Sequence, residues 1–494
     1  MSFNVLETTI AEIHAAYGSR QFTCRELVQM YLDRIEKYDK RGPAINAIIT
    51  VNPNALKEAD RLDQAFKISG PVGSLHGIPV IMKDQGDAVG MPTTLGSVLF
   101  KNYYPDRDAF VVDKLKKAGA IILAKATLGE LGGGDTHGSL FGSTKNPYSL
   151  ERTAGGSSGG SGASVSANFC TVAVGQEGFA SIRRPSTWNC VVGMRPTAGL
   201  VSRSGVYAGW PSVNGSLGPM ARTVTDLAKL LDVMVGYDSE DPVTARGVGR
   251  VNKNFMQFLD SDGLKGARLG VLRESMGYDA EPGSEDFNKI SEVFDKAIAE
   301  LKTAGAEIID PVVIPNLKNL LAKRAGSAAD EEQSFKNFMN RSKNPPYRSK
   351  QDAARSPDFE KVVKHSRERW MRAPSEEASY QYLKAREELM TELLKVMADH
   401  KLDAIVHKSV EHQATLITDG INPPYVDQKG APHINTFLVY VPSIVVPARF
   451  TRDHLPAGIT FLGRPYDDGN MIKFAYAYEQ ATKHRKPPAS VTPL

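Results

Sequence analysis

Three observations in the amino-acid sequence predict an α/β fold built around a central β-sheet. Segments with apolar residues at three- and four-residue spacing alternate along the chain with short apolar runs, which is typical of helices alternating with buried strands. The chain has 494 residues, of which 41% are apolar, so it is long enough for a large core. No internal repeat or long low-complexity tract divides it. We therefore expect a single domain over residues 1–494.

The predicted helices are identified by apolar stripes and by cap signals at their ends. Ile10 and Ile13 lie one turn apart in the first helix, and Thr23 and Glu26 have the spacing of a capping box at the start of the second. Further helices are predicted over residues 55–66, 108–118, 162–169, 223–234 and 287–301.

The predicted strands are short apolar runs between these helices. They cover residues 77–84, 120–124, 171–174, 269–272, 307–309, 404–407, 443–446 and 459–462. The first run ends in Lys83 and Asp84. From its position alone, Lys83 is expected to extend its ammonium group into solvent.

Residues 316–372 differ from the rest of the chain in being heavily charged. The segment contains the turn-forming sequence Asn-Pro-Pro-Tyr at 344–347 and has Trp370 near its end. We interpret it as an inserted helical cap region that lies over the sheet. A merely solvated helical face is the alternative.

Charge and composition exclude several classes of protein. Lys and Arg total 60 against 56 Asp and Glu, and this net charge of +4 is interspersed along the chain, which does not suggest nucleic-acid binding. No apolar run is long enough to span a membrane, and no signal peptide is visible. We expect a cytoplasmic protein in which Cys24, Cys170 and Cys190 are buried free thiols.

Glycine and serine are concentrated in residues 129–162, and a second small-residue loop follows at 175–181. A flexible linker and a phosphate cradle are the other interpretations of the first stretch. No P-loop sequence with its lysine follows a strand there, and the predicted core elements at 162–169 and 171–174 bracket the loops. The two loops carry Ser157 and Ser181, and small residues let backbone N–H groups approach a ligand closely. Such loops favour a site for an oxyanion.

A Ser-His-Asp site is the first catalytic arrangement to consider. Its nucleophile elbow has the sequence Gly-x-Ser-x-Gly on a strand-to-helix turn. Neither Ser157 nor Ser181 has that context. We therefore assign His76, His137 and His407 to packing or hydrogen bonding.

Several motifs in one order resemble the amidase signature family. They are Gly-Ile-Pro-Val-Ile-Met-Lys-Asp at 77–84, Gly-Gly-Ser-Ser-Gly-Gly-Ser at 155–161, Ser-Ile-Arg-Arg-Pro at 181–185 and Gly-Met-Arg-Pro-Thr at 193–197. The spacings from Lys83 to Ser157 and from Ser157 to Ser181 also agree with that family. The match covers the chain to about residue 200 and resumes near the C-terminus.

The resemblance implies a large mixed sheet covered by helices on both faces and a Ser-cisSer-Lys triad. By position, Ser181 would be the nucleophile, Ser157 the proton relay after a cis peptide bond, and Lys83 the base. The backbone N–H groups of Gly178, Phe179 and Ala180, with Ser181 itself as a further donor, would form the oxyanion hole. A metal or cofactor is not implied.

The loop before Ser181 departs from the family pattern. Where the family usually has Thr-Asp-x-Gly-Gly-Ser, this chain has Gln176-Glu-Gly-Phe-Ala-Ser181. Glu177 keeps a carboxylate that can pair with Arg183, but Phe179 and Ala180 replace two glycines. An aromatic ring beside the nucleophile would either shape a substrate pocket or block one.

We therefore predict a hydrolase of carbon–nitrogen amide-type bonds that acts through an acyl-enzyme on Ser181. Its substrate would be a small-molecule amide or carbamate, with anilides and esters as further possibilities. The protein would be a monomer or homodimer without nucleic-acid or membrane partners. The alternatives are a protein that resembles the amidase-type component of a glutamyl-tRNA amidotransferase and works with partner subunits, and a catalytically impaired binding protein.

Overall fold

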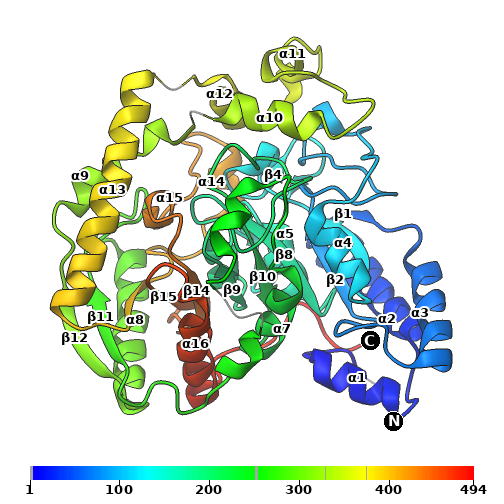
Figure 1. The fold of residues 1–494 in the computed structure, drawn as a ribbon, viewed down its shortest axis with the longest axis horizontal. Helices are drawn as coiled ribbons and strands as arrows, with labels where there is room; N and C mark the ends of the chain where they lie inside the picture. The colour runs from blue at the N-terminus through cyan, green and yellow to red at the C-terminus, as the bar shows by residue number, and fades with distance from the viewer. Residues whose placement is uncertain (1–3, 251–253, 329, 374) are drawn as a thin grey trace.

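The structure, a computed structural model, describes residues 4–250, 254–328, 330–373 and 375–494 (Figure 1). Across these residues, an eleven-stranded mixed sheet forms the centre of the molecule and helices cover both of its faces. This arrangement confirms the predicted fold class.

The sheet combines parallel and antiparallel pairs. In order across the sheet, its strands are β1 (Ile48–Val51), β3 (Ile121–Ala126), β2 (Pro79–Lys83), β8 (Val172–Glu177), β10 (Ser216–Ala221), β9 (Val192–Arg195), β14 (Ser443–Phe450), β15 (Pro456–Leu462), β13 (Ala404–Lys408), β11 (Arg268–Leu272) and β12 (Glu307–Val312). The neighbours β3, β2 and β8 are parallel, as are β13, β11 and β12, and the other pairs are antiparallel. Two small sheets pair β4 (His137–Gly138) with β5 (Gly142–Ser143) and β6 (Lys145–Asn146) with β7 (Ser149–Thr153).

The helices alternate with these strands along the chain. In the first half they are α1 (Ile10–Gly18), α2 (Cys24–Arg34), η1 (Ile35–Lys40), α3 (Ala55–Ser69), η2 (Val98–Phe100), α4 (Phe110–Lys117), η3 (Glu130–Gly132), α5 (Gly159–Ser166), α6 (Arg183–Trp188), α7 (Val224–Met234) and η4 (Pro242–Gly247). In the second half they are η5 (Phe255–Phe258), α8 (Glu285–Thr303), α9 (Leu317–Leu321), η6 (Ala322–Ala328), α10 (Glu331–Met339), α11 (Lys350–Ala354), η7 (Phe359–Lys361), α12 (Lys364–Met371), α13 (Glu376–Asp399), α14 (Ile417–Ile421), α15 (Ile434–Phe437) and α16 (Asp468–Thr482).

Local sequence signals account for several helix ends, whereas both predicted ends of one helix, at residues 162 and 169, were wrong. The capping box between Thr23 and Glu26 is present at the start of α2. Helix α5 begins at Gly159 instead of residue 162 and ends at Ser166. Its first turn packs so closely that a Cβ at Gly160 would clash with the carbonyl oxygen of Thr127. The glycines that resemble a loop in the sequence are therefore required by helix packing.

The charged segment 316–372 is helical, as predicted. It forms α9 to α12 with the short turns between them, and Figure 1 shows α10, α11 and α12 together at one end of the molecule. The main hydrophobic cluster contains residues from both ends of the chain, such as Ile10 and Tyr478. This continuity agrees with the expectation of one domain, which stays a prediction.

Two further expectations concern cysteines and membrane spans. The three cysteines are buried and form no disulfide, which confirms the prediction of free thiols. Among the helices of the described residues, none has the length and apolar character needed to cross a membrane.

Candidate active site

The sheet topology brings the three predicted catalytic side chains together. Lys83 is the last residue of β2, Ser157 precedes α5, and Ser181 lies between β8 and α6. Strands β2 and β8 are parallel neighbours, so the residues at and after their carboxyl ends meet at one edge of the sheet. Residues far apart in the sequence thus share one site.

A chain of hydrogen bonds joins these residues. The Ser157 Oγ lies 2.7 Å from the Lys83 Nζ and 3.0 Å from the Ser181 Oγ. It also lies 2.9 Å from the carbonyl oxygen of Gly132. The peptide bond between Gly156 and Ser157 is cis. Because a hydroxyl group both donates and accepts, Ser157 can exchange protons with either neighbour.

Lys83 is buried, as its implied role as the base requires, whereas the solvent position that its place in the sequence alone suggested was wrong. Only 1% of the residue is exposed. Burial lowers the pKa of Lys83 well below its usual value of 10.5, and the negative charge of Glu177 only partly opposes this effect. No carboxylate within the described part of the chain forms an ion pair with Lys83. The neutral amine that a general base requires is therefore favoured.

Glu177 and Arg183 hold the loop before Ser181, which confirms the predicted pairing. The buried Glu177 carboxylate lies 2.7 Å from the Arg183 Nε. It also accepts hydrogen bonds from the backbone N–H groups of Ile182, at 2.8 Å, and Arg183, at 2.9 Å. Burial alone would raise the pKa of Glu177, but the neighbouring arginines and these hydrogen bonds lower it overall. The ionised carboxylate thus fixes the turn that carries Ser181.

The loop of residues 178–181, which is predicted to form the oxyanion hole, has backbone N–H groups that are unbonded within the described structure and no strained φ angle. Its carbonyl oxygens at Gly178 and Phe179 accept hydrogen bonds from the Thr436 Oγ1, at 3.3 Å, and the Arg183 Nη2, at 2.7 Å. By contrast, the N–H groups of Phe179, Ala180 and Ser181 donate to no acceptor in the described ranges. None of these residues has a positive φ, so Phe179 and Ala180 can replace glycine here.

Sequence reasoning missed several residues that support the site. Arg184 forms an ion pair of 2.7 Å with Asp135 and donates to the carbonyl oxygen of Gly156 at 3.0 Å, next to the cis bond. The Asn435 Nδ2 donates to Glu177 at 3.0 Å. Arg184 is visible in the Ser-Ile-Arg-Arg-Pro motif, whereas nothing in the sequence around Asn435 marks its role.

The predicted packing histidines lie outside the triad. His76 packs against the ring of Phe66, the His137 Nδ1 lies 2.7 Å from the Ser143 Oγ, and the His407 Nδ1 lies 2.7 Å from the carbonyl oxygen of Lys408. These contacts confirm the assignment to packing and hydrogen bonding.

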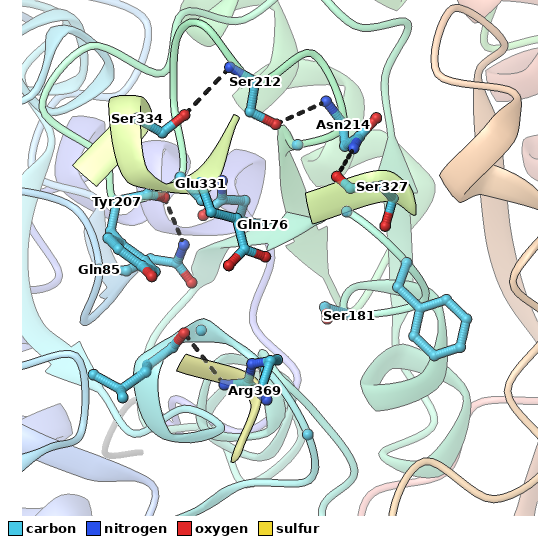
Figure 2. A pocket seen from close by; sticks show the side chains of 18 of the residues that line it. Gln85, Gln176, Ser181, Tyr207, Ser212, Asn214, Ser327, Glu331, Ser334 and Arg369 are labelled. Atoms are coloured by element: carbon cyan, nitrogen blue, oxygen red, sulfur yellow. Dashed lines mark hydrogen bonds between the residues drawn. The ribbon is translucent and has the colours of Figure 1, made fainter. Parts of the chain in front are cut away.

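Ser181 and Lys83 line a pocket of about 200 Å³. Figure 2 shows Ser181 on one side of this space and Gln85 and Tyr207 across from it. The 316–372 segment supplies part of the wall through Arg324, Ser327, Glu331, Ser334, Lys350, Arg369 and Trp370. The segment therefore contributes to the pocket in which the reaction would occur.

Comparisons with known proteins agree with this geometry. The sequence profile of the Amidase family matches residues 26–472. A probable amidase of Arabidopsis thaliana is 32% identical over 513 residues, covering 99% of this chain and 92% of that protein. A glutamyl-tRNA(Gln) amidotransferase subunit of Thermoanaerobacter pseudethanolicus is 33% identical, and the match covers 98% of each chain.

Solved structures give the same result. The native peptide amidase of Stenotrophomonas maltophilia superimposes with a TM-score of 0.87 at 32% identity, covering 99% of each chain. The family profile and these relatives all extend over most of the chain. On this evidence, the chain belongs to the amidase signature family.

Proposed function

We propose that this protein hydrolyses a carbon–nitrogen amide bond through a covalent acyl-enzyme on Ser181. The observation that carries the proposal is the hydrogen-bonded series from Lys83 through Ser157 to Ser181 at the pocket. A serine hydroxyl is a weak nucleophile until a positioned base accepts its proton. The buried Lys83, with its lowered pKa, supplies that base at the end of the series.

In the acylation step, the Ser181 Oγ attacks the carbonyl carbon of the substrate. Its proton passes to the Ser157 Oγ while the Ser157 proton passes to the Lys83 Nζ. The negative charge that develops on the carbonyl oxygen is stabilised by N–H groups of the Gly178–Ser181 loop. Loss of one such donor typically lowers the rate by about 10²–10³-fold.

Collapse of the tetrahedral intermediate breaks the carbon–nitrogen bond. The leaving amine takes a proton from Ser157, which recovers one from Lys83, and the acyl group stays on the Ser181 oxygen as an ester. A water molecule then attacks the ester and gives its proton to the same relay. The carboxylic acid leaves, and Ser181 recovers its hydroxyl proton. These steps use no metal or cofactor.

The substrate is proposed to be a small-molecule amide, with carbamates, anilides and esters as chemically related possibilities. The test is rapid-mixing kinetics with a p-nitrophenyl ester and a p-nitroanilide. An acyl-enzyme predicts release of chromogenic product from both, with a burst that approaches one equivalent where deacylation is slower than acylation. Complete absence of turnover across amides, anilides, carbamates and esters would contradict the proposal and favour an impaired binding protein.

An amidotransferase component is a second candidate because the T. pseudethanolicus amidotransferase subunit resembles nearly the whole chain. This candidate predicts that glutamine is the amide substrate and that partner subunits co-purify with the chain from its native source. Hydrolysis of other amides by the isolated chain, without glutamine hydrolysis, would exclude it.

A further inference from the structure

Arg324, in the 316–372 segment, lies in the active-site pocket without an anionic partner among the described residues. Arg324, on η6, lines the same pocket as Ser181. Throughout the residues that the structure describes, it forms no ion pair or side-chain hydrogen bond. Its guanidinium carbon instead lies 3.7 Å from the centre of the Phe179 ring. A partly buried arginine that stacks on an aromatic ring keeps its N–H donors available for a ligand.

The ring on which Arg324 stacks belongs to Phe179, a residue of the loop that carries the nucleophile Ser181. Its ring lies between Arg324 and His433, whose ring centre is 5.5 Å away. Burial and the nearby charges of Arg324 and Arg183 lower the pKa of His433 to about 4, so His433 is neutral at physiological pH. Phe179, which departs from the family pattern, therefore holds a positive charge in the pocket of Ser181. The other arginine that lines this pocket, Arg369, donates to the backbone carbonyl oxygens of Glu130 and Leu131.

The acidic groups in and near the pocket do not neutralise Arg324. Glu331 is paired with Lys350 at 2.8 Å. Asp427 acts on Arg324 only from beyond ion-pair distance, and its carboxylate accepts hydrogen bonds from the backbone N–H of Asp135 and the amide of Gln428. Burial lowers the pKa of Arg324 to about 10, which leaves the side chain charged at neutral pH.

The turn that carries Arg324 is fixed to the rest of the site. The Asn214 Nδ2 donates to the carbonyl oxygen of Ser327 at 2.9 Å, as Figure 2 shows. The Tyr382 Oη lies 2.6 Å from the carbonyl oxygen of Thr436 and 2.9 Å from the Asn214 Oδ1, and its one proton lies between these two acceptors. Through Thr436, this network reaches the Gly178 carbonyl oxygen of the nucleophile loop. The guanidinium group is thus held in place before a substrate binds.

We propose that Arg324, stacked on Phe179, is a carboxylate-binding residue, so that the preferred substrate is an amide that also carries a free carboxylate. A planar guanidinium matches the two oxygens of a carboxylate with parallel hydrogen bonds. The proposal deepens the function given above and rests on it. It concerns which amide the pocket selects, and Arg324 acts by binding and orienting that substrate.

The test uses pairs of substrates that differ only in the carboxylate. On the acyl side, glutaryl-p-nitroanilide carries the carboxylate and pentanoyl-p-nitroanilide lacks it. On the amine side, N-acetyl-4-aminobenzoate carries it and acetanilide lacks it. The variants are R324M, which removes the charge, and R324K, which keeps the charge without the planar fork. K323M is the matched control, because Lys323 is the exposed neighbour of Arg324 on the same turn and does not line the pocket.

We expect kcat/KM to favour the carboxylated member of one pair by about 10- to 100-fold, the range for a hydrogen bond to a charged group. R324M should abolish that preference, R324K should retain part of it, and K323M should keep it unchanged. No preference in either pair, or an equal loss for both members in R324M, would overturn the proposal.

A binding measurement separates this inference from the proposed hydrolysis. Glutarate and 4-aminobenzoate are titrated calorimetrically into the wild-type protein, R324M and K323M. We expect at least one of the two carboxylates to bind the wild type and K323M at least tenfold more tightly than R324M. If the enzyme shows no turnover but binding follows this pattern, the proposed hydrolysis is contradicted and the carboxylate site stands. If binding is equal in R324M and the wild type, or absent in all three proteins, the carboxylate site is overturned.

Discussion

Replacing Ser181 with alanine is expected to lower kcat by about 10⁶-fold, as is typical when the nucleophile of a serine hydrolase is removed. The Ser181 Oγ is the atom that would form the acyl bond, and the hydroxyl of Ser157 lies 3.0 Å from it. The measurement is steady-state turnover of a p-nitrophenyl ester together with labelling by a fluorophosphonate probe. Both should be lost.

The control for this variant is Ser327→Ala, which removes a hydroxyl from the same pocket outside the triad. It should retain labelling, and both variants should keep the unfolding temperature of the wild type within a few degrees. Undiminished labelling of Ser181→Ala would show that another residue is the nucleophile.

Replacing Lys83 with methionine is expected to have two opposite effects. It should lower kcat by about 10²–10⁴-fold, the usual contribution of a general base. It should also raise the unfolding temperature at neutral pH, because methionine removes a buried amine that has no carboxylate partner among the described residues. If Lys83 stabilised the fold, its replacement by methionine would not raise the unfolding temperature.

The stability gain should depend on pH in a defined direction. Burial lowers the pKa of Lys83 in the folded protein below its usual value of 10.5. Between these two values the unfolded chain binds one more proton than the folded protein, so the stability of the wild type rises with pH. The advantage of Lys83→Met should therefore shrink as the pH approaches 10.5. Thermal unfolding from pH 7 to 10 measures this, and an advantage that grows with pH would contradict it.

Lys125 provides a matched control on the neighbouring strand. It is also fully buried, but its Nζ lies 2.9 Å from the Asp84 carboxylate. Replacing Lys125 with methionine leaves a buried carboxylate unpaired, which typically destabilises a protein by about 3–5 kcal/mol. The two substitutions are chemically identical, so opposite changes in the free energy of unfolding would isolate the missing partner of Lys83 as the cause.

Most strands of the sheet were predicted from local apolar runs in the sequence. All eight predicted runs are strands, whereas β1 at one edge of the sheet and β9 and β10 near its centre were missed. Strand β10 contains Gly218 and Pro219, residues that weaken a strand pattern. It forms because β8 and β9 pair with it on both sides. Pairing partners from distant segments cannot be read from the residues themselves.

The residues of the candidate site also differ in whether the sequence alone could predict their role. Lys83, Ser157 and Ser181 lie in compact motifs that resemble the amidase signature family, and only this resemblance implied that they act together. The partial burial of Arg324 and its stacking on Phe179 depend on how η6 packs over the sheet. A charged segment of this kind is equally typical of a solvated surface, so its contribution to the pocket became visible only in the structure.

The central claim is a covalent acyl group on Ser181, and mass spectrometry of protein quenched with acid during turnover tests it most directly. With a p-nitrophenyl ester in excess, we predict that the peptide containing Ser181 gains the mass of the acyl group in place of one hydrogen. Fragmentation should assign that mass to Ser181, and it should be absent from Ser181→Ala. An acyl group on Ser157 or another residue, or full turnover without acylated protein under conditions that give a kinetic burst, would contradict the account.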